Sequence, residues 1–253
     1  FECGISEHSA MAITGFGMMG LATGDFELAI RCGDLAHRIV RKTNGTAAAG
    51  WITLITSMYI DPYTMPFADI IPRLRTGYVV SMEAGEFEVG FINWQTSNVF
   101  AFVAGYELKS LLKAAEITHE QYRMYRVESM IGTSQAFLTL FRVLSGAEPP
   151  DWDKLEEQSR RNLNKEKLDG SETYVLLPYF QATLILAVYM RRHHIAQGLL
   201  KCFNFIASED TSLVTVAPRE FFGGLICANL YRETGKKKHL RKMQKLHKQL
   251  RTV

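Results

Sequence analysis

Three glycines near the start of the chain have the spacing of a dinucleotide-binding loop. Gly15, Gly17 and Gly20 match G-x-G-x-x-G, a pattern that binds a pyrophosphate where it follows a strand and opens a long crossover helix. Only Met11 to Ile13 precede it as a possible strand, and Gly24 ends the next segment after about two helical turns. We therefore interpret these glycines as small residues that allow close helix packing, and we expect no cofactor in this chain.

Histidine and cysteine side chains are the next candidates for chemistry, as metal ligands or catalytic groups. His193 and His194 lie near Cys202 in the sequence, and His239 and His247 are eight residues apart. Two ligands on one helix come together at a separation of about four residues rather than eight. We expect no metal site and no catalytic residue. An all-α enzyme with a pocket around His193 and His194 stays open as an alternative.

Motifs of common enzyme classes are missing from the sequence. It contains no P-loop, no H-E-x-x-H and no G-x-S-x-G, so P-loop phosphate binding, zinc-protease chemistry and the hydrolase nucleophile elbow have no support. The four cysteines are widely spaced, without C-x-x-C. This spacing favours buried free thiols in a reducing cytoplasm over a zinc ribbon or a disulfide framework.

Polar side chains on one charge-free segment are the best candidates for a binding surface. Residues 89–106 contain no Asp, Glu, Lys or Arg, yet they include Asn93, Gln95, Thr96 and Asn98. On a concave surface of a helical array, amides of this kind could hold a peptide backbone. The alternative is that these side chains are buried and bonded to neighbouring helices.

The C-terminal segment concentrates the positive charge. Eight Lys and Arg residues follow Glu233 with no Asp or Glu among them, so a chain of net charge +3 has a body of −5. The candidate binding residues of this segment are Lys237, Arg241, Lys245 and Lys248. The segment is the closing helix of a hairpin, a surface for acidic partners or nucleic acid, or an amphipathic helix for a membrane surface or a calmodulin-type partner. The acidic body argues against nucleic-acid binding over the whole surface.

The elements that must position these residues are helices. Apolar residues recur with helical periodicity almost throughout, and strand-like alternation is nearly absent. Turn signals at residues 24, 61, 105, 146, 192 and 235 are 37 to 46 residues apart, a spacing typical of stacked helix hairpins. We predict an all-α fold, an α-solenoid of about six antiparallel hairpins in a right-handed superhelix. Charge-free segments such as 9–24 and 89–106 are expected to be its inner helices.

The first hairpin has the clearest turn chemistry. Gly24 can end one helix in the left-handed conformation, and Asp25 can cap the next. Gly17, Ala29 and Ala36 stand where tetratricopeptide hairpins need small residues for close helix approach. The similar turn at Gly85 to Glu88 is expected to join two hairpins rather than lie inside one.

The composition of the chain limits the broad class of protein to which it can belong. The chain has 253 residues, 47% of them hydrophobic and 22% charged, which is typical of a globular protein. No run of about 18 strongly apolar residues is present, so the sequence argues against a membrane channel or transporter. The first residue is Phe1 and no signal peptide follows. We expect the chain to be part of a longer protein.

Several of these segments, in their order and spacing, resemble one protein family. The resemblance is carried by His8–Ala10, Gly24–Ala29, Gly33–Ala36, Ile60–Pro66, Ile71–Pro72, Gly77–Tyr78 and Ala84–Glu88. From about Glu7 to Thr234 the chain resembles the tetratricopeptide-like helical-repeat region of large predicted ATPases, which include multi-sensor histidine kinases and related serine/threonine kinase fusions. Asp61 departs from the pattern because members often have Trp there. The basic tail after Gly235 departs from it as well.

The resemblance implies a scaffold rather than a catalyst. In that family the repeats follow a P-loop ATPase module and precede sensor, kinase or cyclase modules, so no catalytic residue carries over. We expect a TPR-like repeat domain at residues 1–235 and a basic C-terminal helix at residues 236–253 that closes the last hairpin. The expected function is a cytoplasmic interaction or regulatory scaffold that binds a protein or peptide and neighbouring modules. The alternative is a helical adaptor that binds nucleic acid, acidic partners or a membrane surface through the basic helix.

Overall fold

The chain folds into helices that pack in adjacent pairs. A computed structural model describes residues 4–163, 170–206 and 213–250, and within these ranges it has twelve α-helices and no strand. The described helices form two compact units, one within residues 4–127 and the other within residues 128–206 and 215–250. The predicted all-α helical-repeat fold is confirmed. The division into two units inside residues 1–235 is a feature that the sequence analysis did not predict.

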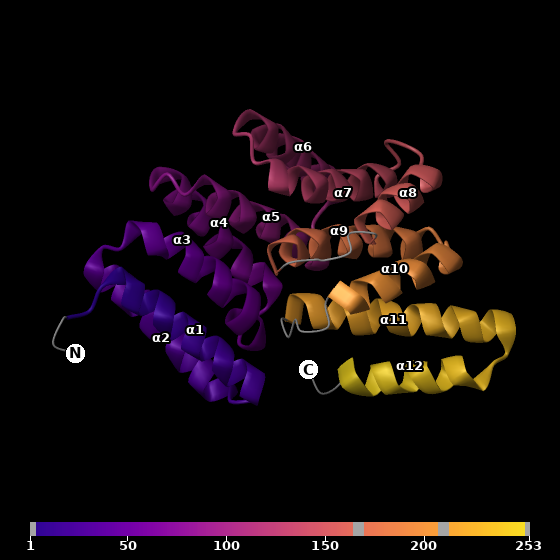
Figure 1. Ribbon diagram of the computed structural model, residues 1–253, viewed down its shortest axis with the longest axis horizontal. Coiled ribbons are helices and arrows are strands. Elements are labelled where there is room, and N and C mark those ends of the chain that lie inside the picture. The colour runs from indigo at the N-terminus through magenta and orange to yellow at the C-terminus, as the bar shows by residue number, and fades with distance from the viewer. Residues whose placement is uncertain (1–3, 164–169, 207–212, 251–253) are drawn as a thin grey trace. The chain divides into compact units, whose positions relative to one another are not determined.

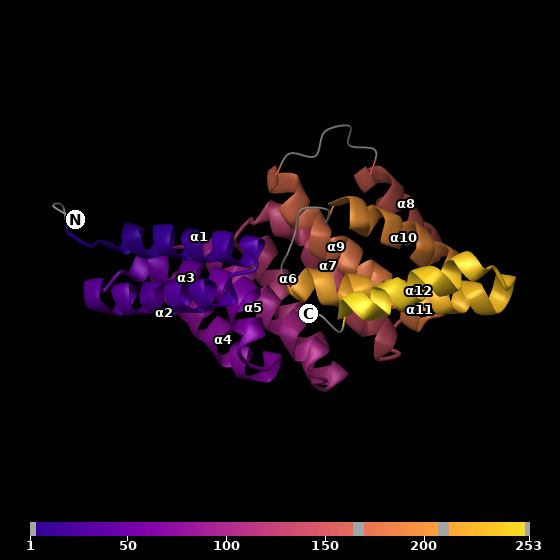
Figure 2. The same ribbon diagram turned by 90° about the horizontal axis from the view of Figure 1, so that it is seen from below.

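The first unit begins with an antiparallel hairpin. Helices α1 (Glu7–Thr23) and α2 (Phe26–Thr43) lie side by side in both views (Figures 1 and 2). Gly24 ends α1 with a φ of +81°, and the Asp25 side chain accepts a hydrogen bond of 3.0 Å from the backbone N–H of Leu28. The turn predicted at Gly24 and Asp25 is therefore confirmed.

Small residues bring α1 and α2 close together. A β-carbon at Gly17 would lie 2.9 Å from Cβ of Cys32, and one at Gly20 would lie 3.1 Å from the carbonyl oxygen of Asp25. Ala29 and Ala36 are fully buried in the same hairpin. The glycines of the G-x-G-x-x-G match thus lie within a helix, and Gly17 and Gly20 serve its packing, as predicted, whereas Gly15 has no close neighbour.

The next pair departs from an ordinary helix–turn–helix. Helix α3 (Thr46–Ile55) continues into a π-helical segment, η1 (Thr56–Ile60), and then into a 3₁₀ turn, η2 (Asp61–Tyr63), before α4 (Phe67–Glu83). A π-helical segment places more residues per turn than an α-helix and is often found at functional sites. The predicted turn at Asp61 is therefore made without a glycine.

Helix α5 (Phe87–Val103) is the buried helix of the first unit. It packs along α4 as closely as α2 packs along α1, so the turn at Gly85, with a φ of +80°, lies inside a hairpin. The expectation that this turn joins two hairpins is wrong. Helix α6 (Leu108–Met124) follows, and its Tyr122 hydroxyl donates a 3.1 Å hydrogen bond to the carbonyl oxygen of Phe91. The two rings meet edge to face at 5.0 Å, an arrangement that favours aromatic pairs.

The second unit contains the remaining helices. They are α7 (Glu128–Leu144), α8 (Trp152–Leu163), α9 (Gly170–Tyr189), α10 (His193–Ile206), α11 (Leu213–Thr234) and α12 (Lys237–Leu250), with α11 belonging to the unit from Thr215 onward. Helix α9 packs against both α7 and α10. Gly146 and Gly235 have positive φ, as does Arg191 in place of a glycine, so these turns fall at or next to the predicted residues.

Helix α12 lies along α11 (Figures 1 and 2), as expected for a helix that closes the last hairpin. A β-carbon at Gly223 of α11 would lie 3.3 Å from Cδ1 of Leu246 and 3.6 Å from Cδ2 of Leu200. Leu240, Met243, Leu246 and Leu250 are all half-buried. The apolar side of α12 thus packs against its own unit.

One prediction about burial is wrong. Residues 9–24 were expected to form an inner helix, yet Met11, Phe16 and Met19 of α1 are exposed, Met19 to 64%. Helix α1 is the first helix of the stack and packs mainly against α2, α3 and η1, and these neighbours leave Met11, Phe16 and Met19 uncovered. Absence of charge therefore does not by itself place a helix inside the fold.

Candidate functional site

The polar side chains of α5 lie inside the first unit rather than on a surface. Asn93, Gln95, Thr96 and Asn98 are each less than 9% exposed. The Asn93 amide donates to the carbonyl oxygens of Gly50, at 3.1 Å, and Val89, at 2.9 Å. The prediction that they line a concave binding surface is corrected, because α5 is covered by its neighbours. Asn93 instead links α5 to α3.

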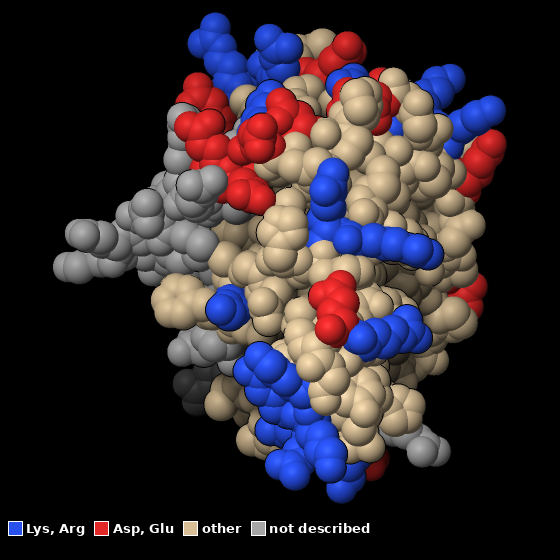
Figure 3. All heavy atoms as spheres, turned by 90° about the vertical axis from the view of Figure 1, so that its right-hand side faces the viewer, with Lys and Arg blue, Asp and Glu red and all other residues tan. Residues whose placement is uncertain are grey.

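The cationic side chains of α12 are exposed, as a binding surface requires. Lys237, Arg241, Lys245 and Lys248 all face solvent, while the apolar side of the helix does not. Figure 3 shows the side of the molecule that is on the right in Figure 1. Lys and Arg side chains gather on its lower part, where α12 lies. The arrangement fits an acidic partner surface.

One histidine of the second unit, His194, lines a mainly apolar pocket. His194 lies 4.0 Å from a carboxylate oxygen of Glu156, and His193 Nδ1 lies 3.3 Å from the Asn229 amide nitrogen. Burial raises the pKa of the Cys202 thiol, which lines the same pocket of about 460 Å³. A raised thiol pKa disfavours the nucleophilic thiolate. Among the described residues no three His, Cys, Asp or Glu side chains converge as metal ligands.

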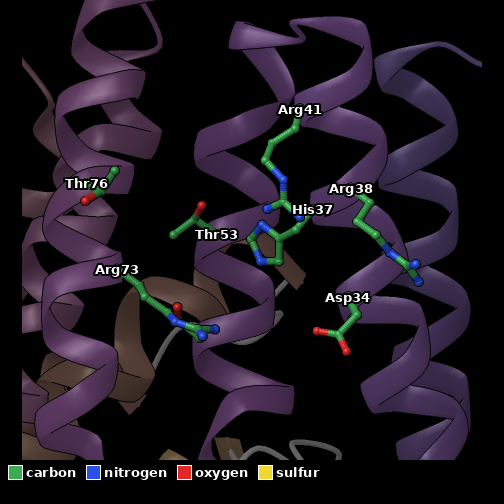
Figure 4. A pocket seen from close by; sticks show the side chains of 8 residues that line it. Asp34, His37, Arg38, Arg41, Thr53, Arg73 and Thr76 are labelled. Carbon is green, nitrogen blue, oxygen red and sulfur yellow. The ribbon is translucent and has the colours of Figure 1, made fainter.

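A polar pocket in the first unit brings together more charged and hydrogen-bonding side chains than either predicted surface. It has a volume of about 620 Å³ and is lined by Asp34, His37, Arg38, Arg41, Thr53, Ser57, Arg73 and Thr76. In Figure 4, Arg41 and Arg73 reach from α2 and α4 toward the space around His37, whereas Arg38 extends away from Arg73. Arg41, Arg73 and Asp34 therefore surround a floor of hydroxyl groups and one imidazole, and Arg38 lies at the edge of the pocket.

Helical spacing puts these residues on the pocket walls. On α2, Asp34, His37, Arg38 and Arg41 are three or four residues apart and share one face of the helix. Thr53 and Ser57, four apart, span the junction of α3 and η1, and α4 supplies Arg73 and Thr76 with a separation of three. Each wall thus contributes side chains from successive turns.

An ion pair between η2 and α4 fixes one wall. Arg73 Nη1 donates to Asp61 Oδ2 at 3.1 Å, and the Asp61 side chain is only 10% exposed. A guanidinium has five N–H donors, so this contact leaves others for a ligand. In the structure, the role of Asp61 is to hold Arg73.

His37 forms the neutral part of the floor. Its Nε2 lies 3.0 Å from Thr56 Oγ1, and that hydroxyl donates to the carbonyl oxygen of Ile52 at 2.8 Å. Because the hydroxyl hydrogen is used, Nε2 is the donor in this pair. Burial lowers the pKa of His37, and the Arg73 and Arg41 charges lower it further against the opposing effects of Asp61 and Asp34. The imidazole is therefore uncharged at neutral pH.

Ser57 is the one pocket residue whose buried hydroxyl lacks a partner. It is fully buried, and within the described part of the chain its Oγ has no hydrogen-bond partner. A buried hydroxyl without a partner costs free energy, so a ligand atom that accepts its hydrogen would relieve that cost. With Arg41 and Arg73 nearby, the chemistry of this pocket suits an anion.

Sequence reasoning did not find this pocket. The spacing of Asp34, His37 and Arg41 along one helix face is readable from the sequence, but nothing local says that Arg73 and Ser57 face it.

The comparisons with known proteins add no identification. Among the described helices none is both long enough and apolar enough to cross a membrane. No family model, curated protein or solved structure matches the chain in these comparisons, so the resemblance to the repeat region of signalling ATPases stays a prediction.

Proposed function

We propose that the chain is an interaction or regulatory scaffold that binds a protein or peptide segment through the arginine-lined pocket of α2, α3 and α4. The observation that supports this most is the set of exposed Arg38, Arg41 and Arg73 side chains above a polar floor. Stacked helix hairpins are rigid supports for such surfaces. An acidic segment is the partner whose charge fits this rim.

The scaffold, on this proposal, has no catalytic residues of its own and no cofactor. Burial raises the pKa of the thiols of Cys32, Cys202 and Cys227, so each is held in its less reactive protonated form. These three described cysteines are free and buried, which supports a reducing compartment, and we place the protein in the cytoplasm.

Selection of peptides from a random displayed library tests the pocket as a peptide site. We expect the selected peptides to be rich in Asp and Glu and to lose at least tenfold in affinity on R41Q, because a charge-assisted hydrogen bond is removed. R123Q removes the same charge from an exposed position on α6 and is the matched control. Selection of peptides that bind the wild type and R41Q equally would contradict the proposal.

We further propose that the chain is the helical-repeat part of a larger signalling protein of ATPase or kinase type, where it holds neighbouring modules. The support is the order and spacing of the segments that resemble that family. Reading the coding sequence on both sides of this chain tests it. A P-loop upstream and a kinase, cyclase or sensor module downstream is the expected result. Flanks with neither would end the family assignment.

A second candidate function belongs to α12. Its exposed Lys237, Arg241, Lys245 and Lys248 favour an adaptor that binds acidic partners, nucleic acid or an anionic membrane surface. Binding to a DNA duplex and to anionic vesicles, measured at two salt concentrations, tests this. Replacing the four residues with Gln would abolish binding that is steeply salt-dependent. Binding that survives the replacement would exclude α12 as the site.

A further inference from the structure

We propose that the pocket of α2, α3 and α4 recognises a phosphate monoester carried on a serine or threonine of the bound segment. Arg41 and Arg73 supply the guanidinium donors and Ser57 supplies a hydroxyl donor. This inference rests on the proposed function, because it names the chemistry of the segment that the scaffold binds.

The number and placement of donors favour phosphate over carboxylate. A carboxylate has two oxygens and one negative charge, whereas a phosphate monoester has three terminal oxygens and a charge of about −1.5 to −2 at pH 7. The pocket offers donors from three separate elements, with Arg41 on α2, Ser57 on η1 and Arg73 on α4. A phosphate can direct a separate oxygen to each of the three donors and carries more charge, whereas a carboxylate has two oxygens in one plane and a single charge.

The buried hydroxyl of Ser57 is the observation that points to a ligand. Its Oγ is buried and has no hydrogen-bond partner among the described residues, while its neighbour Thr56 already donates to Ile52. The π-helical segment η1 holds Ser57 on the pocket lining. An oxygen of the phosphate would accept the hydrogen that this side chain cannot place within the protein.

The pocket also carries its own negative charge, which limits what binds. Asp61 already occupies one donor of Arg73, and Asp34 stands exposed on the α2 wall. A monoanion therefore gains little electrostatic stabilisation in this pocket, whereas a dianion gains more from Arg41 and Arg73. A phosphate group alone fills a small part of about 620 Å³, so the ligand carries further atoms, as a peptide segment does.

Fluorescence binding with two degenerate peptide libraries tests the inference. One library has a fixed central phosphoserine and the other has Glu at the same position, and inorganic phosphate serves as a competitor. We expect the phosphoserine library to bind at least tenfold more tightly than the Glu library, and millimolar phosphate to displace it. R41Q should reduce the phosphoserine affinity at least tenfold, S57A should reduce it severalfold, and R123Q should leave it unchanged.

Each other outcome has a separate meaning. Equal binding of the two libraries, both lost on R41Q, overturns the phosphate inference and leaves the proposed acidic-segment function standing. Absence of binding by either library overturns both. Binding of inorganic phosphate without binding of the phosphoserine library overturns the inference in favour of a free phosphate ester. R73K, which keeps the partner of Asp61, replaces R41Q should that variant fail to fold, and it too is expected to weaken phosphoserine binding because Lys lacks the guanidinium fork.

Discussion

At the scale of single residues, burial distinguishes the polar side chains of the first unit that stabilise the fold from those that are available to a ligand. Asn93 is fully buried and bonds to Gly50 and Val89, whereas Arg41 is exposed at the pocket rim. Polar residue type in the sequence did not separate these roles. The amide that was expected on a binding surface is buried and bonded inside the fold, and the proposed binding residues come from α2, η1 and α4.

Replacement of Asn93 tests its structural role. N93A removes a hydrogen bond between α5 and α3 at a fully buried position, so we expect a loss of about 1 to 3 kcal/mol in the free energy of unfolding. Urea denaturation followed by circular dichroism measures it, with N204A on the exposed side of α10 as the control. Unchanged stability together with lost peptide binding would restore the surface interpretation of Asn93.

The titration of His37 makes stability depend on pH. Its pKa in the folded chain is lowered from the usual 6.5, mainly by burial, so the unfolded chain binds the proton more readily. Stability contributed by neutral His37 is therefore present above about pH 6.5 and is lost as the pH falls below it. We expect wild type to lose more unfolding free energy than H37Q between pH 7.5 and 5.5. A larger loss in H37Q would contradict the lowered pKa.

At the scale of elements, the contact between α1 and α2 depends on Gly17. Gly15, two residues earlier in the same helix, has open space around it. A β-carbon at Gly17 would lie 2.9 Å from Cβ of Cys32, while one at Gly15 would meet nothing within 4 Å. We expect G17A to destabilise the protein by about 1 to 3 kcal/mol through overpacking. G15A should stabilise it by about 0.5 to 1 kcal/mol through helix propensity. Thermal and urea unfolding measure both, and equal effects would exclude close packing at Gly17.

Helix α12 is held to its unit by one apolar side. Leu246 contacts the Gly223 region of α11, so L246A should loosen α12 by about 1 kcal/mol or more. Hydrogen exchange would show faster exchange in residues 237–250 and unchanged exchange in α1 to α5. Q244A, on the exposed side of the same helix, is the control. Slow exchange of α12 in L246A would mean that other contacts hold the helix.

Much of the element pattern could be predicted from the sequence, because it depends on local chemistry. Gly24, Gly85, Gly105, Gly146 and Gly235 all adopt positive φ at the turns. The π-helical segment at Thr56 to Ile60 and the exposure of α1 could not be predicted, since both depend on which helices are neighbours. The pocket was missed for the same reason: its residues come from segments about 20 positions apart in the sequence.

At the scale of the whole molecule, the two compact units carry separate candidate surfaces. The arginine-lined pocket belongs to the first, and the basic face of α12 belongs to the second. The first unit offers a shaped site with a buried unpaired donor, whereas α12 offers charge without a pocket. A charged helix face binds many polyanions, whereas hydrogen-bond donors at fixed positions in a pocket discriminate among ligands. The central claim therefore concerns the pocket.

Site-specific photo-crosslinking within the full protein in its native cells tests that claim most directly. A photoreactive benzoylphenylalanine at Thr76, on the pocket wall, and another at Glu120, on the exposed side of α6, form the matched pair. The proposal predicts that Thr76 crosslinks, identified by mass spectrometry, fall on an acidic or phosphorylated segment of a partner or a neighbouring module, and that R41Q removes them. Crosslinks that are the same from Glu120, or that survive R41Q, would contradict the pocket as the binding site.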